Sequence, residues 1–390
     1  MNKDYKQCNK GLWDTSVPGI SFDQNGSSNY SKIFNHLDNE YPKGNSGKKQ
    51  WENIVKKIKS SNKGKYDCLI GVSGGVDSSY LLYLAKNKYG LNPLAFTFDN
   101  GWSSDIAVKN IYKMTKALDI DLETYVVNYE EMKEIHKSYM KARIPWIDAP
   151  TDFAIKSSLY KIAKREKIKN ILIGHDFRSE GTQPNEWTHC DSKQLKYIVK
   201  NFSSKKIKFK SYPLLSTWKL LLYSQLYQIK IIKPFYHIEY DKHLARKFLE
   251  SKYDWKYYGE HHHENLFTKF AISDWLYNKF NIDKRIITYS AQVLSQSLDR
   301  NEAIKKISKN PYDVKDLDKN REYVFKKLGM SSEEFMNIFK SKNCNIYDYP
   351  SYLRLFNMIS FITWPILKLI LPQKPSFLFQ QEERKILKNE

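Results

Sequence analysis

Short apolar segments alternate with amphipathic segments over residues 49–240. The apolar segments have the length of buried strands and occupy residues 66–72, 93–98, 122–127 and 171–173, with a further candidate at 231–234. Between them, apolar side chains are spaced as on one face of a helix, at residues 51–58, 78–87, 106–118 and 154–166. This alternation predicts an α/β fold, built on a doubly wound parallel sheet with helices on both faces.

The chain on either side of this alternation has a different character. Residues 1–48 are rich in Asn, Ser, Gly and Asp, which predicts an irregular N-terminal arm. Beyond about residue 240, the pattern predicts helices rich in aromatic side chains and lysine. We therefore divide the chain into the arm (1–48), an α/β domain (49–240) and a helical region that binds substrate or a partner (241–390).

The most apolar stretch of the sequence is residues 352–372. Arg354, Asn357, Pro365 and Lys368 interrupt it, so it is a poor membrane-spanning helix. Burial in the protein or against another subunit is the first interpretation, and a position in a membrane interface is the second. Any association with a membrane is expected to be peripheral at most.

Charge and cysteine content bear on the binding partner and the cellular compartment of the protein. The net charge is +21, but only nine of the 64 basic residues are arginine, the residue preferred for phosphate and guanine contacts, so a nucleic-acid partner is not favoured. The first ten residues are polar and give no secretory signal. The cysteines form no close pair, which fits a reducing cytoplasm and predicts a cytoplasmic protein; they are Cys8, Cys68, Cys190 and Cys344.

A phosphate-binding loop directly follows the first predicted strand. Its sequence is Ser73-Gly74-Gly75-Val76-Asp77-Ser78-Ser79, and a predicted helix begins within it. The two glycines let the backbone approach an anion, to which the helix presents free N–H groups and the positive end of its dipole. The serines add hydroxyl donors, and the Asp77 carboxylate suits Mg²⁺. The loop is neither a Walker A loop nor a dinucleotide-binding fingerprint.

Further polar residues follow the second and fourth predicted strands, where a doubly wound sheet binds its ligand. The second strand is followed by Phe98, Asp99, Asn100 and Trp102. The fourth strand is followed by Gly174, His175, Asp176, Arg178 and Glu180. We expect Asp176 or Glu180 to complete a Mg²⁺ site with Asp77, and Arg178 to offset charge in a transition state.

The loop resembles the PP-loop of the ATP pyrophosphatase superfamily, whose pattern is Ser-Gly-Gly-x-Asp-Ser. The resemblance implies ATP and Mg²⁺ as cofactors. ATP would bind along 73–79, with 98–100 and 174–175 beside it. It also implies cleavage of ATP between the α- and β-phosphates, in which a carbonyl-type oxygen is adenylated and a nitrogen or sulfur nucleophile then displaces AMP.

Three segments of the helical region resemble the N-acetyl sugar amidotransferases of this superfamily. They are residues 257–270 (YYGEHHHENLFTKF), 280–285 (FNIDKR) and 295–303 (SQSLDRNEA). The resemblance extends over about residues 5–350 and implies a role in surface-polysaccharide, lipopolysaccharide O-antigen or flagellin-sugar biosynthesis. Such an enzyme converts the acetamido group of a nucleotide-linked N-acetyl sugar into an acetamidino group, releasing AMP and pyrophosphate.

Together, the motifs give two sets of candidate side chains. The catalytic candidates are Asp77, Asp176, Glu180, His263 and Glu264. The candidate substrate contacts are Trp102, Asp148, Arg178, Lys284 and Arg285, with Trp146 and Asp152 nearby in sequence. Residues 283–285 equally fit a helix cap with paired charges. The three histidines at 261–263 are not expected to bind one metal ion, because neighbours on an extended chain point to opposite faces.

The zinc knuckle of that family is incomplete in this chain. Its four cysteine positions fall on Cys8, Gly11, Ser28 and Ser31, so three thiolates are absent. Because glycine and serine cannot replace thiolates around tetrahedral zinc, we expect no zinc here and a packing role for the arm.

The source of ammonia is expected to lie outside this chain, because no cysteine has the context of a glutaminase nucleophile. The family resemblance implies a glutaminase subunit and a cyclase-like ammonia-channelling subunit, both similar to those of imidazole glycerol phosphate synthase. Two alternatives stay open. One is a PP-loop enzyme that adenylates a tRNA base before nitrogen or sulfur transfer, and the other is a regulatory protein that binds nucleotide without catalysis.

Overall fold

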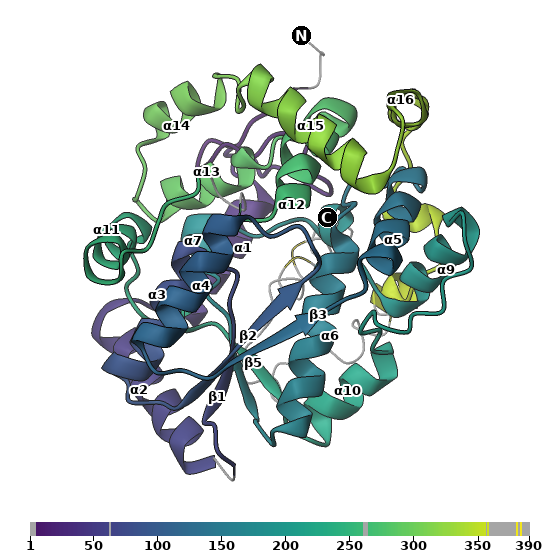
Figure 1. Cartoon of the computed structure of the whole chain (residues 1–390). Helices are drawn as coiled ribbons and strands as arrows, with labels where there is room; N and C mark the ends of the chain where they lie inside the picture. Colours follow the sequence, from purple (N-terminus) through teal and green to yellow (C-terminus); the bar gives the residue numbers. More distant parts are fainter. Residues whose placement is uncertain are drawn as a thin grey trace.

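The centre of the molecule is a five-stranded sheet, seen in a computed structural model that describes residues 5–61, 64–259, 264–355, 357, 358, 380 and 383. Every pair of neighbouring strands is parallel, in the order β3–β2–β1–β4–β5 (Figure 1). The strands are β1 (Cys68–Gly71), β2 (Pro93–Asp99), β3 (Leu122–Val126), β4 (Asn170–Leu172) and β5 (Lys230–Ile232). The predicted doubly wound α/β fold is confirmed, and the candidate strand near residue 231 is β5.

Helices cover both faces of the sheet, because alternate side chains of its buried strands point to opposite sides. On one face, Leu69 of β1 packs with Leu159 of α6 (Ala149–Arg165). On the other, Ile70 packs with residues of α2 (Gly44–Ser61), α3 (Val76–Tyr83) and α4 (Asp105–Ala117). The remaining α-helices are α1 (Asn29–Glu40), α5 (Tyr129–Lys141), α7 (Phe177–Glu180), α8 (Asn185–Thr188), α9 (Ser192–Phe202), α10 (Thr217–Gln225), α11 (Lys242–Tyr253), α12 (Leu266–Phe270), α13 (Arg285–Leu294), α14 (Arg300–Ile307), α15 (Val314–Leu328) and α16 (Ser332–Lys340).

The topology fixes where a ligand would bind. The chain runs outward from β1 in both directions, to β2 and β3 on one side and to β4 and β5 on the other. The order therefore reverses at β1, and the crevice at the carboxyl end of β1 is the ligand position expected of such a sheet. The loop 73–79 leaves β1 at this point.

The N-terminal arm is more regular than its composition predicts. Residues 29–40 form α1, and α2 begins at Gly44 rather than near Trp51, so the prediction of an irregular arm over 1–48 is wrong for its C-terminal part. Local chemistry explains the helix: the Ser28 hydroxyl caps it by accepting from the backbone N–H of Ser31, and Ile33 and Leu37 bury one helical face.

The incomplete zinc frame is held together by hydrogen bonds. The buried Cys8 Sγ accepts the backbone N–H of Ser28 at 3.2 Å, and the Ser31 hydroxyl donates to the Ser28 carbonyl at 2.6 Å. A Cβ on Gly11 would lie 2.7 Å from the Trp13 ring. These contacts pack the frame tightly within the arm.

The helical region packs directly on the α/β unit. α11 lies against α3, and α13 lies against α7. Phe267 and Trp275 of this region share one hydrophobic core with Phe96 of β2. Of the apolar stretch 352–372, residues 356 and 359–372 lie outside the described residues. Within the part that is described, no helix is both long enough and apolar enough to cross a membrane.

Candidate functional site

The loop after β1 has a backbone that requires glycine. Gly74 has a φ of +81°, and a Cβ on it would lie 2.3 Å from the carbonyl oxygen of Ala107 in α4. Gly174, after β4, lies against the start of α3: a Cβ on Gly174 would lie 2.9 Å from the Asp77 carbonyl carbon. The two glycines let α4 and the β4 loop approach the start of α3.

The N-terminus of α3 carries no side-chain cap. Its N-cap residue is Gly75, whereas Ser104, Asn128 and Asp176 accept backbone N–H groups at the starts of α4, α5 and α7. The first N–H groups of α3, and the positive end of its dipole, are thereby available for an anion. This is the arrangement that the loop sequence predicts for a phosphate.

The serines of the loop have different surroundings. The Ser73 Oγ accepts the N–H of Gly75 at 3.3 Å, and the Ser78 hydroxyl donates to the Gly75 carbonyl at 3.3 Å. Ser79 is buried and accepts a hydrogen bond from Trp255 Nε1 at 3.2 Å. Ser79 and the buried Val76 therefore hold α3 in the fold, while Ser73 and Ser78 shape the loop itself.

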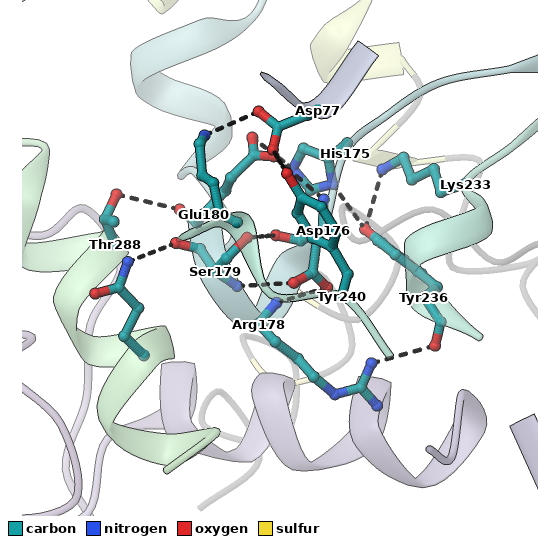
Figure 2. A network of polar contacts seen from close by, with 12 residues as sticks. Asp77, His175, Asp176, Arg178, Ser179, Glu180, Lys233, Tyr236, Tyr240 and Thr288 are labelled. Carbon is teal, nitrogen blue, oxygen red and sulfur yellow. Dashed lines mark hydrogen bonds and ion pairs between the residues drawn. The ribbon is translucent and has the colours of Figure 1, made fainter. Parts of the chain in front are cut away.

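Asp77, in the first turn of α3, is engaged by two side chains that the sequence analysis did not single out. The Lys242 Nζ donates to Asp77 Oδ2 at 2.8 Å, and the Tyr240 hydroxyl donates to Asp77 Oδ1. Figure 2 shows Asp77 and Tyr240 beside Glu180. Both partners follow the carboxyl end of β5, so the rule that placed candidates after β2 and β4 would have found them.

Lys242 interacts with three of the predicted catalytic carboxylates. Burial disfavours its charge, but Asp77, Glu180 and Glu264 outweigh burial and raise the pKa of Lys242 above its ordinary value. A Cβ on Gly75 would lie 3.8 Å from Glu264 Oε1 and 2.9 Å from the Tyr258 hydroxyl, which places both groups beside the loop. Asp77 thus pairs directly with Lys242, while Glu180 and Glu264 act on the same ammonium group electrostatically.

A second chain of contacts extends from Glu180. Its carboxylate accepts the N–H of Asp176 at 3.2 Å and lies 3.8 Å from His175 Nε2 (Figure 2). The other ring nitrogen of His175 lies 3.3 Å from the Tyr236 hydroxyl, to which Lys233 donates at 3.1 Å. Burial lowers the pKa of Lys233 to about 8, against the effect of Glu180. His175 therefore connects the carboxylate cluster to a second lysine.

Two candidates near the β4 loop have structural roles. Asp176 is the N-cap of α7, and its carboxylate oxygens accept the N–H groups of Arg178 and Ser179. The Arg178 guanidinium is buried, donating to the Tyr236 and Tyr41 carbonyls and pairing with Asp38. Arg178 is therefore committed to the fold rather than to a transition state, and Glu180 is better placed than Asp176 to share a cation with Asp77.

The candidates after β2 support the fold around the loop. The Asp99 carboxylate accepts the Gly101 N–H at 2.8 Å, and the buried Asn100 donates to Thr151 at 3.1 Å. Trp102 is fully buried, and its carbonyl accepts the N–H of Leu266, two residues after Glu264. Trp102 therefore positions the segment that carries Glu264, and in this structure it is not placed to contact a substrate. Phe98 is likewise buried.

Asp148 is also an interior residue. It is 1% exposed, its Oδ1 lies 3.4 Å from His136 Nε2, and its Oδ2 accepts from the Thr268 hydroxyl at 2.5 Å. Burial lowers the pKa of His136 below its ordinary value. This pair ties α5 and α6 to α12, so the predicted substrate contact of Asp148 is replaced by a structural one.

Residues 283–285 divide between the two roles predicted for them. Arg285 pairs with Asp283 at 2.7 Å and donates to the carbonyls of Lys306, Ile307 and Lys309, which makes it a structural clamp at the end of α14. Lys284 instead lies 4.5 Å above the Trp146 ring, whose Nε1 donates to Asp152 at 2.7 Å.

Lys284 is the predicted substrate contact that remains available. Burial lowers its pKa to about 8, although Asp152, Glu180 and Asp148 act in the opposite direction. Its charge is thus only partly compensated by the protein, which suits a site for an anionic ligand.

Among the residues that the structure describes, no group of three or more His, Cys, Asp or Glu side chains is arranged to hold a metal ion. His263 lies outside the described residues, so its predicted catalytic role stays a prediction.

One comparison links the helical region to a named family. Residues 264–362 match the family model described as "LPS biosynthesis protein WbpG-like, C-terminal domain". The match begins at Glu264, the residue placed beside the phosphate loop, and includes α12 to α16.

The other matches are to individual proteins. An uncharacterized protein of Methanocaldococcus jannaschii, MJ1599, is 30% identical over 129 residues, which are 33% of this chain and 45% of that protein, so the chain spans less than half of its length. The U34-tRNA thiolase NcsA of Methanococcus maripaludis is 16% identical, with a TM-score of 0.33, covering 64% of this chain and 78% of that one. The NH3-dependent NAD synthetase of Campylobacter jejuni is 10% identical, with a TM-score of 0.32, covering 73% and 99%.

Proposed function

We propose that this protein is an ATP-dependent amidotransferase that acts on a nucleotide-linked N-acetyl sugar. The acetamido oxygen would attack the α-phosphate of ATP and release pyrophosphate. Ammonia would then add to the activated carbon, and AMP would leave with the former amide oxygen. The product carries an acetamidino group in place of the acetamido group.

The observation that carries this proposal is the pairing of an uncapped phosphate loop with Glu264, the first residue of the WbpG-like match. The loop supplies the anion site that ATP cleavage needs. The matched region supplies a link to lipopolysaccharide biosynthesis, in which nucleotide sugars are the activated substrates. Together, the two features support a reaction that couples ATP cleavage to a nucleotide-sugar acceptor.

The residues present fit ATP as its Mg²⁺ complex. The N–H groups at the start of α3 would bind phosphate oxygens, and Asp77 with Glu180 would hold Mg²⁺, whose charge stabilises the departing pyrophosphate. The Lys242 ammonium, which donates to Asp77, would contribute a second positive charge at the phosphates.

The groups around the acceptor are Glu264, His175 and Lys284. Glu264 lies close enough to the loop to accept the proton that the attacking ammonia loses. Lys284, above the Trp146 ring, would bind the anionic part of the nucleotide sugar. His175, between Glu180 and Tyr236, would orient Glu180.

Ammonia would come from separate subunits. The free cysteines of the described chain are Cys8, Cys68, Cys190 and Cys344, of which the first two are buried and the others half-buried. Burial raises the pKa of the Cys68 and Cys190 thiols, which opposes formation of a nucleophilic thiolate. We therefore propose a glutaminase partner and a cyclase-like ammonia-channelling partner.

The test measures pyrophosphate and AMP release from ATP·Mg²⁺ with ammonium chloride, comparing UDP-N-acetyl sugars with bulk tRNA. We expect sugar-dependent release and a product about one mass unit lighter than its substrate. A sugar labelled with ¹⁸O in its acetamido group should transfer the label to AMP. Release only with tRNA would transfer the protein to the RNA-modifying branch, and unlabelled AMP would contradict adenylation of the amide.

Matched variants separate the site from the fold. Asp77→Asn should abolish sugar-dependent release, whereas Asp121→Asn should not, because Asp121 is an exposed carboxylate that pairs with Lys65 before β3. Equal turnover by the two variants would contradict the assignment of Asp77.

A further inference from the structure

Helix α10 presents apolar side chains to solvent. Trp218, Leu222 and Leu226 are 64%, 45% and 69% exposed, and Leu221 is 39% exposed. Spacings of three and four residues place these side chains on one face of the helix. The opposite face, which includes Leu220 and Tyr223, packs on the main core. The exposed stripe is therefore a feature of a helix that is anchored in the fold.

Lysines lie on the side of α10 that adjoins α6. Lys219 is on α10 itself, and Lys161 is on α6, which packs against α10. Lys164 Nζ lies 5.3 Å from the Tyr223 ring and 4.9 Å from the Tyr227 ring. Glu166, at the end of α6, is already paired with Arg165. Lysines and tyrosines thus lie along one side of the apolar stripe, where α10 adjoins α6.

The sequence around α10 has the same bias. Residues 192–238 contain ten lysines but no aspartate, glutamate or arginine. Arginine, which this segment lacks, is the residue preferred in nucleic-acid sites, whereas leucine, tryptophan and lysine together are typical of helices that lie in a lipid interface. An acidic protein surface would need an apolar groove as well to match this stripe, but an anionic bilayer offers both properties at every point.

We propose that the α10 face, defined as Trp218, Leu221, Leu222 and Leu226 with the lysines around them, docks the protein on an anionic lipid surface. The leucines and Trp218 would enter the headgroup boundary, and Lys161, Lys164 and Lys219 would meet lipid phosphates. This inference is independent of the reaction proposed for the site.

The position of α10 agrees with this arrangement. α10 contacts the C-terminal half of α6 and leads towards the first residue of β5, so it lies near the amino-terminal edge of the sheet (Figure 1). The loop 73–79 lies at the opposite, carboxyl-terminal edge. A protein docked through the α10 face would keep its nucleotide site open to solvent.

The experiment is co-sedimentation of the full chain with vesicles of phosphatidylcholine alone or with phosphatidylglycerol. We expect binding to the anionic vesicles only, weakened by salt. The double variant Leu222→Ser/Leu226→Ser should lose about tenfold in partitioning, and Lys219→Gln about fivefold. The control is Tyr112→Ser, which removes a 58% exposed aromatic residue from α4 on the other face of the sheet and should bind like the unmodified chain.

Three results would overturn the proposal. The first is no binding to anionic vesicles, which is also the result expected if another segment of the chain covers the α10 face. The second is unchanged binding by the double leucine variant. The third is a dimer in solution that this variant dissociates, because the face would then bind a second copy.

Discussion

The ammonium group of Lys242 lies 2.8 Å from the carboxylate of Asp77, which joins the first turn of α11 to the first turn of α3. The two residues are 165 positions apart in the sequence. Through this contact the helical region supplies a charge to the phosphate loop. Neither half of the chain contains the complete site.

Removing the Lys242 charge should therefore reduce catalysis. We expect Lys242→Met to lower sugar-dependent pyrophosphate release by about 100-fold, the usual effect of losing one group that stabilises charge in a transition state. Steady-state kinetics would measure this loss. The control is Lys247→Met, which removes an exposed lysine from the same helix. Similar kinetics for the two variants would contradict the role of Lys242.

The sequence predicts the sheet, the loop and three carboxylates of the site, because each depends on local pattern. Apolar runs define the strands, and the loop 73–79 has a recognisable chemistry. Lys233, Tyr240 and Lys242 follow β5, so their place after a strand is visible in the sequence. Their contacts are not, because these depend on how the segment after β5 returns to the loop. The sequence predicts Asp148 and Trp102 as substrate contacts, but both are buried. Their positions in the sequence do not reveal whether their side chains are buried.

The main error in the arm has a physical reason as well. Asn, Ser and Gly predict irregular structure, yet Ser28 and its neighbours act as a cap and leave α1 to form from Tyr30, Ile33, Phe34 and Leu37. Composition alone does not distinguish polar residues in irregular structure from polar residues that cap a helix. The spacing of the four apolar side chains was the better guide.

Gly74 provides a test of loop geometry. A Gly74→Ala variant should lose about 2–5 kcal/mol of unfolding free energy, because the left-handed φ is strained and the new Cβ would displace the Ala107 carbonyl. Urea unfolding would measure the loss. Gly44→Ala is the matched control: its φ is +68°, but no atom lies within 4 Å of the new Cβ, so only about 1–2 kcal/mol should be lost. Equal losses would contradict the close approach of α4.

Lys284 should make substrate binding sensitive to pH. Its pKa of about 8 lies below the ordinary value for lysine, so its positive charge is lost as the pH rises through 8. We expect the KM for the nucleotide sugar to rise by up to about tenfold between pH 8 and pH 9. Lys284→Arg should reduce this dependence because arginine stays protonated.

Lys233, whose pKa is also about 8, is the comparison for that profile. Lys233 donates to Tyr236 rather than facing Trp146, so Lys233→Arg should leave the pH dependence of KM largely in place. If the pH dependence of KM changes in Lys233→Arg but not in Lys284→Arg, the proposed contact between Lys284 and the anionic group of the substrate is wrong.

We expect the stability of the zinc frame not to depend on zinc, either in the unmodified chain or after the missing cysteines are restored. EDTA is expected to leave the melting temperature unchanged, because hydrogen bonds of Cys8, Ser28 and Ser31 hold the frame. The triple variant Gly11→Cys/Ser28→Cys/Ser31→Cys restores four thiols in sequence. It should still unfold more easily than the unmodified chain in the presence of zinc, because the Cβ at position 11 would lie 2.7 Å from the Trp13 ring. A triple variant stabilised by stoichiometric zinc, detected by metal analysis and calorimetry, would show that the Trp13 ring yields easily.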